Sequence, residues 1–292
     1  MRGLWERMAF APTARSYSPL LTLALLAPIL VLLGAVFYLP IARLLGSSFL
    51  DPGFTLEHYE RIASVPLYPT ILVRTLRTAF IVTALCLVLG FPVAYLLARL
   101  RGWQLLLVAT LVTIPLWTSV LVRSFAWTVL LQRNGIINDF LVGIGLVDEP
   151  LRLLYTEQAV WLAMAHILLP FTILPIYATL RGISADLPKA AQSLGAGPVS
   201  VFLRVTLPMS LPGVAAGSIL VFILSLGFFI TPALVGGATS LMISTLIGQQ
   251  VTQTFNWPFA AAISAVLLLV TLVIVVAFNR FLRFDRVVGD GS

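Results

Sequence analysis

The sequence is poor in charged residues and in cysteine. Asp, Glu, Lys and Arg make up 10% of the 292 residues, and Cys86 is the single cysteine. A soluble domain carries about 25% charged residues, so this composition excludes an ordinary soluble fold. One cysteine excludes an internal disulfide, and 60% hydrophobic residues exclude a disordered chain. The mean hydropathy of +1.04 instead indicates an integral membrane protein.

The sequence also lacks the groups that build common catalytic and metal sites. Its only lysine, Lys189, follows Pro188, whereas a phosphate-binding G-x-x-x-x-G-K-[ST] loop needs glycine before the lysine. His58 and His166 lie far apart and neither accompanies a cysteine pair, so a zinc site is not expected. We therefore expect no catalytic residue and no cofactor in this chain.

The charged residues are confined to the segments between six charge-free stretches of 20–24 residues. About 20 helical residues cross a hydrocarbon core of about 30 Å. The sequence thus predicts an all-α membrane protein with six transmembrane helices, at 20–42, 78–98, 103–122, 159–180, 212–235 and 258–279. Trp103, Trp117, Trp127, Trp161 and Trp257 fall near the ends of these spans, which is typical of interfacial anchors.

Basic residues predict the orientation. Six spans place both termini on one side, and the segments on that side hold eleven basic and four acidic residues, against seven and seven on the other. The positive-inside rule then puts both termini in the cytoplasm. The predicted plan is a cytoplasmic segment at 1–19, a membrane domain at 20–279 and a cytoplasmic tail at 280–292. The net charge of +7 belongs to one face of a bilayer protein, so nucleic acid is not expected as a partner.

Carboxylates are missing from all six predicted spans. Ion-coupled carriers usually place acidic or paired polar groups at mid-membrane, so a nucleotide-independent secondary carrier is the weaker alternative. A membrane enzyme or scaffold is weaker still, because His166 is the only titratable imidazole at that depth. His166 is either a functional residue or a neutral histidine bonded to a neighbouring helix. Gly213 and Gly217 form a G-x-x-x-G that indicates a close helix contact or arises by chance.

The predicted cytoplasmic loop at 182–211 reads as two short helices joined at a glycine. Asp186 is placed to cap the first helix, and Gly195 to end it. Gly197 and Pro198 suit the start of the second, whose expected end is Pro208. Exposed small and apolar residues on this loop favour a protein partner, although packing on its own bundle is the alternative.

This loop resembles the E-A-A, three residues, G, nine residues, I-x-L-P pattern of binding-protein-dependent ABC importer permeases. The corresponding residues are Lys189-Ala190-Ala191, Gly195 and Val205-Thr206-Leu207-Pro208. The chain departs from the pattern at Lys189, where the family usually has glutamate, and at Val205. Softer similarities to the spermidine/putrescine-type branch lie at 115–119, 133–138, 231–237 and 256–259.

The resemblance implies a type I importer permease in the bacterial inner membrane. Its partners would be two ATPase subunits that bind ATP and Mg²⁺, a second and paralogous permease subunit, and a periplasmic solute-binding protein. The solute would be a polyamine or, alternatively, another small organic molecule. The residues expected to couple to the ATPase are Asp186, Lys189, Ala190, Ala191, Gly195, Val205, Leu207 and Pro208. Those expected along the translocation path are Trp117, His166, Tyr177 and Phe228.

Overall fold

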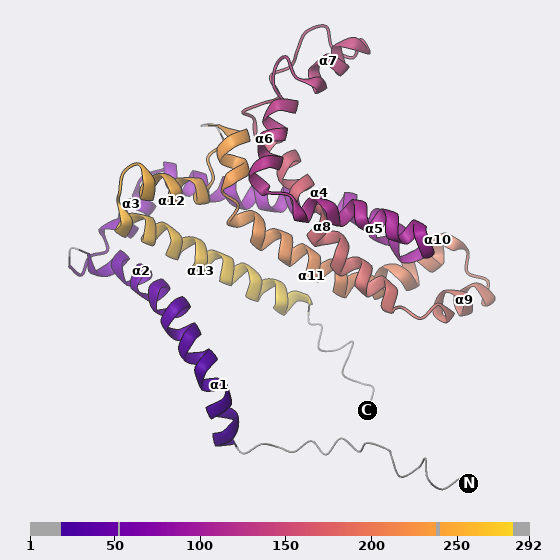
Figure 1. Ribbon diagram of the computed structural model, residues 1–292, viewed down its shortest axis with the longest axis horizontal. Helices are drawn as coiled ribbons and strands as arrows, with labels where there is room; N and C mark the ends of the chain where they lie inside the picture. Colours follow the sequence, from indigo (N-terminus) through magenta and orange to yellow (C-terminus); the bar gives the residue numbers. More distant parts are fainter. Residues whose placement is uncertain (1–18, 52, 238–239, 283–292) are drawn as a thin grey trace.

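The computed structural model describes residues 19–51, 53–237 and 240–282, and these residues form helices, turns and loops without a strand (Figure 1). Most of the predicted N-terminal segment and of the predicted C-terminal tail lies outside the described residues. Five helices are long and apolar enough to cross a membrane, and a sixth span arises if one sharply bent pair is counted as one. The prediction of an all-α, six-span membrane protein is therefore confirmed.

The first span is one helix from Leu20 to Leu50. It comprises α1 (Pro19–Leu33), the π-helical turn η2 (Gly34–Tyr38) and α2 (Leu39–Leu50). Part α1 lies apart from the other helices (Figure 1). In the most apolar 18-residue stretch of the Leu20–Leu50 helix, no residue is buried within the chain. Nothing in this chain covers it among the described residues, so its apolar surface is left for lipid or another subunit.

The centre of the molecule is a bundle of α4 (Leu67–Arg99), α8 (Glu157–Gly182) and α11 (Leu207–Leu226). On α4, the buried side chains recur every three or four residues, so a single stripe of the helix faces the bundle. They include Ala79, Val82, Cys86, Gly90, Ala94 and Leu97. Helix α4 begins eleven residues before the predicted span, so two arginines precede its charge-free part.

Helices α8 and α11 touch through backbone. A Cβ added to Gly213 would lie 2.7 Å from the carbonyl oxygen of Pro175, and one added to Gly217 would lie 3.1 Å from that of Thr172. Both distances are shorter than ordinary van der Waals contacts, so a side chain at either position would push the helices apart. The G-x-x-x-G pair is thus a true contact and not a chance match.

The third predicted span is broken. Helix α5 (Gly102–Trp117) ends five residues early, and α6 (Val120–Leu130) follows at an angle of 98°. Ser119 caps α6 by accepting a hydrogen bond from the backbone N–H of Leu121. The connection from α6 to α8 is partly structured and contains α7 (Ile136–Gly143).

The fifth predicted span, 212–235, is wrong at both ends. The helix begins at Pro198 and ends at Leu226, combining α10 (Pro198–Val201), the π-helical η3 (Phe202–Thr206) and α11. Beyond Gly227 the chain turns into η4 (Pro232–Gly236). At this break the carbonyl oxygen of Phe228 receives its hydrogen bond from a side chain, because the Ser244 hydroxyl donates to it at 2.6 Å.

Pro208 does not end the second loop helix, contrary to prediction. It is the second residue of α11, directly after η3, where the N–H of Leu207 bonds the carbonyl of Phe202 five residues back. A proline lacks its N–H and clashes with the carbonyl four residues earlier. The wider π turn accommodates both effects, so the helix continues through the proline.

The remaining helices are short or terminal. Helices α3 (Glu57–Ser64) and α12 (Ile243–Thr252) lie at one end of the bundle, and α9 (Asp186–Ser193) with α10 lies at the other (Figure 1). Helix α13 (Trp257–Leu282) runs along the bundle as the last span. Phe259 near its start is fully buried between His58 and Tyr68.

Replacing Gly213 by alanine tests the α8–α11 contact. We expect the overpacked side chain to destabilise the folded protein by about 1–3 kcal/mol, partly offset by alanine's better helix propensity of about 1 kcal/mol. Thermal unfolding of the purified protein in detergent measures the effect. Gly182→Ala is the control, because nothing lies within 4 Å of its added Cβ. An unfolding temperature for Gly213→Ala equal to that of the control would contradict the contact.

Candidate functional site

The predicted coupling loop forms an elbow between α8 and α11, defined here as residues 183–206. Its first helix, α9, starts at Asp186, and its N-cap is Ala185, so Asp186 stands one position inside the predicted cap. The Ser184 hydroxyl accepts the N–H of Asp186 at 3.3 Å instead. Asp186 in the first turn is favourable to the helix dipole. Lys189 lies 3.5 Å from Asp186, and both side chains are largely exposed, so this pair adds little stability.

Gly195 ends α9 in a left-handed conformation, with φ of +87°. Its N–H donates to the carbonyl of Gln192, and the N–H of Ala196 donates to that of Ala191. These two bonds are the Schellman arrangement, which positions the glycine one residue beyond the cap. A Cβ at Gly195 would meet nothing within 4 Å, so the space around it is open. The positive φ, and not crowding, is the reason that the backbone requires glycine here.

The elbow presents apolar side chains away from the bundle. Leu194 is 89% exposed and Val199 is 71% exposed, and Leu187 and Ala190 are also exposed. Ala191 is half-buried. Large apolar groups held this far from the protein core favour burial against another protein.

The second half of the elbow is part of the bundle. Val201 is buried, and the ring of Phe202 packs edge-on against Phe91 and Tyr95 of α4, with centroid distances of 6.0 and 5.4 Å. Val205 and Leu207 are half-buried, and Pro208 is exposed. The helix runs unbroken from Pro198 to Leu226, so the second half of the elbow and α11 are parts of one helix.

The four residues predicted along a translocation path do not share one environment. Trp117 is 90% exposed at the end of α5. Tyr177 packs on the cluster around Ile173 and Ile176, whereas Phe228 packs on a different cluster around Met164 and Met242. His166 stands on an exposed part of α8.

His166 is bonded to a neighbouring helix, which matches the structural alternative considered from sequence. Trp127 of α6 donates its indole N–H to Nδ1 of His166 at 3.2 Å, and the two rings are nearly perpendicular. An accepting Nδ1 leaves the imidazole proton on Nε2. The sequence marked Trp127 only as an interfacial anchor, because nothing in its spacing relates it to a residue on another helix.

Arg123 ties the break between α5 and α6 to α8. Its guanidinium donates to the carbonyl oxygen of Thr118 at 3.3 Å and reaches that of Ile167 at 3.5 Å. The free carbonyl at the break is therefore satisfied by a cationic side chain rather than by a regular helical bond.

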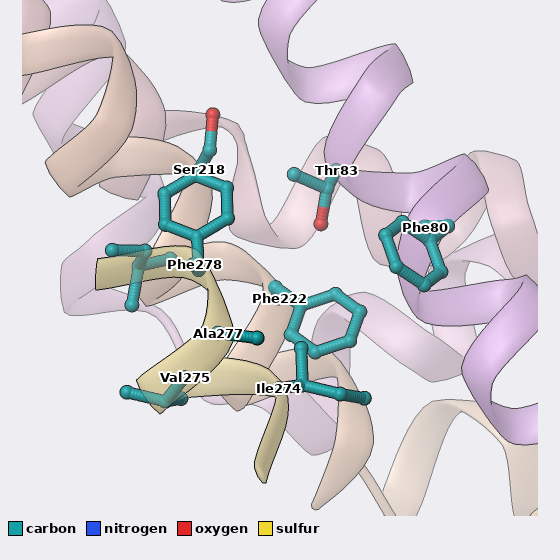
Figure 2. A pocket seen from close by; sticks show the side chains of 9 residues that line it. Phe80, Thr83, Ser218, Phe222, Ile274, Val275, Ala277 and Phe278 are labelled. Atoms are coloured by element: carbon teal, nitrogen blue, oxygen red, sulfur yellow. The ribbon is translucent and has the colours of Figure 1, made fainter. Parts of the chain in front are cut away.

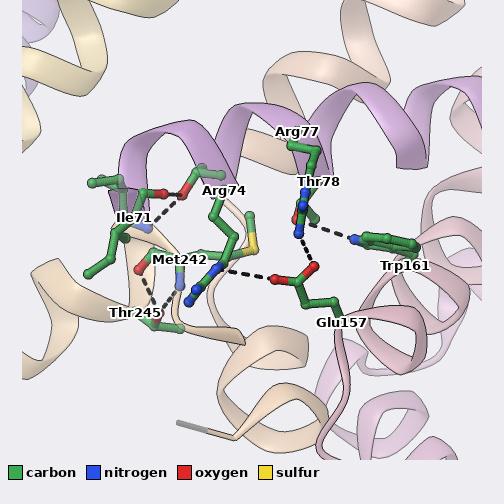
Figure 3. A network of polar contacts seen from close by, with 10 residues as sticks. Ile71, Arg74, Arg77, Thr78, Glu157, Trp161, Met242 and Thr245 are labelled. Carbon is green, nitrogen blue, oxygen red and sulfur yellow. Dashed lines mark hydrogen bonds and ion pairs between the residues drawn. The ribbon is translucent and has the colours of Figure 1, made fainter. Parts of the chain in front are cut away.

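An ion-pair network that sequence reasoning missed joins α4 and α8 (Figure 3). Glu157, the first residue of α8, accepts from Arg74 at 3.2 Å and from Arg77. Trp161 lies beside Arg77 and donates its indole N–H to the Thr78 hydroxyl at 3.4 Å. Two arginines three residues apart share a helix face, and this spacing was the available signal. It was overlooked because the predicted span began after them.

A cavity of about 460 Å³ opens between α4, α11 and α13 (Figure 2). Phe80, Phe222, Ile274 and Phe278 line it, and its polar side-chain groups are the hydroxyls of Thr83 and Ser218. The Thr83 hydroxyl is already bonded to the carbonyl of Ala79. A polar solute would find almost no hydrogen-bond partners there, so the cavity suits acyl chains or an apolar helix.

Glu157→Gln tests the network. Removing the shared carboxylate leaves two guanidiniums without a counter-charge, and partial exposure limits the expected loss of stability to about 1 kcal/mol. Thermal unfolding at low and high salt measures the loss, which we expect to shrink at high salt. Glu149→Gln is the matched control, because Glu149 is exposed and makes no ion pair among the residues that the structure describes. Equal unfolding temperatures for the two variants would contradict a stabilising role.

Comparison with known proteins adds the following similarities. Residues 7–283 match the family described as binding-protein-dependent transport system inner membrane component. The chain is 35% identical to the spermidine/putrescine transport system permease protein PotB of Escherichia coli strain K12, across 84% of this chain and 92% of the relative. It is 34% identical to the inner membrane ABC transporter permease protein YdcU of the same strain, across 91% and 90%.

A solved structure has the same fold. One chain in the crystal structure of a bacterial ABC transporter that imports the acidic polysaccharide alginate superimposes with a TM-score of 0.71. The match covers 92% of this chain and 96% of the other, at 23% sequence identity.

Proposed function

The chain belongs to the family of binding-protein-dependent transport system inner membrane components, and on that premise we propose that it forms half of the translocation pathway of an ATP-driven importer. It is an inner-membrane permease with a type I importer fold. The proposed second half is a paralogous permease subunit. Two ATPase subunits bind ATP and Mg²⁺ outside this chain, and a periplasmic protein delivers the solute.

The observation that carries this proposal is the elbow on a continuous helix. The elbow offers Leu194 and Val199 for burial in an ATPase groove, and its second half extends as one helix from Pro198 into the bundle. Closure of the ATPase pair on ATP then moves the elbow as a lever. Since Phe202 is packed against α4, the motion rotates α4 and α11 together between outward- and inward-open states.

The residues of the elbow have distinct proposed roles. Ala190 and Ala191 let the ATPase backbone approach closely, and Gly195 sets the turn between the two helices. Asp186 and Lys189 hold each other weakly, so Lys189 remains available to an acidic ATPase residue where the family usually offers glutamate. The helix continues from the elbow through the π turn into the membrane at Val205, Leu207 and Pro208, and these residues would transmit the motion.

Orientation and domain plan follow from the same assignment. An elbow that docks an ATPase is cytoplasmic, and α8 and α11 then lead outward from it. With six spans, the N-terminal segment at 1–19 and the tail at 280–292 lie on the cytoplasmic side of the membrane domain at 20–279, in agreement with the excess of basic residues there.

A polyamine is the first proposed solute, because the similarity to a spermidine/putrescine permease extends over most of the chain. The described spans supply aromatic faces, including those of Trp117 and Trp127, and aromatic faces attract ammonium groups. The carboxylate of Glu157 at the start of α8 is already held by Arg74 and Arg77, and the remaining span residues supply none, so the paired permease must neutralise a polycation. A different small organic solute, moved by the same machinery, is the alternative.

The proposed path runs past the break between α5 and α6, where Trp117 and His166 are exposed and Trp127 lies half-buried beside His166. Tyr177 and Phe228 would act from the two clusters on which they pack. A nucleotide-independent carrier would need its coupling group at this break, and His166 is the residue it would use.

Copurification is the direct test of the assembly. An affinity-tagged chain extracted from its native membrane should bring an ATPase and a second six-span permease, identified by mass spectrometry. A chain that purifies alone and transports solute without nucleotide would overturn the proposal and move attention to His166.

Gly195→Asp tests the coupling role of the elbow. We expect it to abolish ATP-driven uptake and to release the ATPase, because a buried unpaired charge at a docked interface costs several kcal/mol. Membrane insertion should be unchanged, and any fall in the unfolding temperature should equal that of the asparagine control below, since both side chains enter open space and adopt the same positive φ. Gly195→Asn is the matched control, of nearly the same size, tolerant of positive φ and uncharged. Normal uptake by Gly195→Asp would contradict the assignment.

A further inference from the structure

The connection between α6 and α8 holds a pocket of about 400 Å³ with two arginines in its wall. Arg133 and Arg152 line it together with Gln132, Pro150, Leu153 and Tyr155. Both arginines are exposed. The ion pairs among the described residues are made by Arg74, Arg77 and Lys189, so within that part of the chain neither pocket arginine has a carboxylate partner. The pocket wall thus carries two guanidinium groups that make no ion pair within the described residues.

A buried amide holds the two sides of this pocket together. Asn138 is fully buried, and its side-chain NH₂ donates to the carbonyls of Gln132 and Leu151, each at 3.0 Å. Its side-chain oxygen accepts the N–H of Leu151 at 2.9 Å. Gln132 and Leu151 are the neighbours of Arg133 and Arg152 in the chain. One side chain therefore fixes the backbone that carries both guanidiniums.

The turn after α6 is also tightly packed. A Cβ added to Gly135 would lie 2.7 Å from the carbonyl oxygens of Val129 and Leu130, so only glycine fits there. The tight packing at Gly135 and the hydrogen bonds of Asn138 together hold the backbone of the pocket in one conformation. Arginines that merely reach toward lipid phosphates need no such frame, because their long side chains adjust by themselves.

The pocket is joined to the membrane bundle. Leu153 and Leu154 pack on the buried cluster of Leu131, Ala159, Ala163 and Val235. The N–H of Tyr155 bonds the carbonyl of Val235 at 3.0 Å, and its ring lies against Gly237 after η4. Tyr155 has a φ of +62°, which is costly for a bulky residue and indicates that its surroundings hold it in place. Helix α8 begins two residues later.

Position relative to the elbow identifies the side of the membrane. The pocket immediately precedes α8 and the elbow immediately follows it, and 26 helical residues separate them by about 39 Å. If the elbow is cytoplasmic, the pocket lies on the outer side. Helix α7 and its flanking loops extend away from the bundle, accessible to a large partner (Figure 1).

We propose that this pocket, with Arg133 and Arg152, binds a carboxylate side chain of the solute-binding protein when that protein docks on the outer face. The inference rests on the proposed importer function. Guanidinium groups bind carboxylates in a two-bond fork, and a frame that fixes two of them selects a partner in one orientation. A binding protein docked at this pocket would contact the segment that is bonded to η4 and that leads into α8. The other end of α8 leads into the elbow.

The test uses the complete importer in nanodiscs of zwitterionic lipid. ATPase activity is measured against the concentration of the separately purified, solute-loaded binding protein. For Arg133→Gln with Arg152→Gln, we expect the half-maximal concentration to rise about tenfold or more with an unchanged maximal rate. Raising NaCl from about 50 to about 300 mM should increase the wild-type value and leave that of the variant nearly unchanged.

Two controls separate docking from general effects. Arg133→Lys with Arg152→Lys keeps the charge without the fork and should give an intermediate value. Arg61→Gln removes an outer-side charge that is already held over the Phe259 ring at 4.6 Å, and it should behave as wild type. Basal ATPase activity and subunit composition confirm that each complex is assembled. Where the double variant lowers the yield of a complex that still holds both permeases, Arg152→Gln alone is measured, with a smaller rise expected.

Other outcomes would overturn the inference. A half-maximal concentration equal to wild type in the double variant would exclude docking at this pocket. Loss of the second permease would assign the pocket to the subunit interface, and a defect seen only with anionic lipid would assign it to a headgroup. A wild-type complex that no binding protein stimulates would instead refute the proposed function, and this inference with it.

Discussion

The close approach of α8 and α11 is the contact on which the remaining arrangement depends. Gly213 and Gly217 bring the two helix backbones together at Pro175 and Thr172, and this contact sets where the helix that begins in the elbow meets the bundle. Helix α4 packs over both, with Gly90 close to Thr172 and Ile173. In a bilayer, lipid tails are as apolar as leucine, so helices associate through tight packing more than through hydrophobicity. Small residues at the crossing therefore hold the three-helix core together.

Proline is tolerated in these helices in two ways. Pro170 and Pro175 lie inside α8 without ending it. Pro40 and Pro208 each stand second in an α-helix that directly follows a π turn, and in both cases the preceding leucine bonds a carbonyl five residues back. The same device thus appears in the first span and in the elbow helix. A local widening of the helix relieves the proline clash while the helix continues.

The sequence predicted the helical class, the number of spans and the elbow, because each rests on a local signal. Charged residues flank α8 closely, and its predicted and observed ends differ by two residues. No charged residue occurs from 205 to 279, so nothing in that stretch marked where the fifth span begins or ends. The Trp127–His166 bond and the Glu157 network join residues far apart in the chain. Their partners depend on how helices pack, which spacing along one helix does not reveal.

The unbroken helix from Pro198 to Leu226 also explains why the spacing in the elbow is strict. Each residue turns an α-helix by about 100°, so one residue inserted or deleted between Gly197 and Gly213 would rotate the elbow by that angle relative to the bundle. Phe202 would then leave α4, or the glycines would leave α8. The interval between Gly195 and the Leu207-Pro208 pair is therefore a rotational register as well as a length. Chains of this design can change the residues in that interval far more readily than their number.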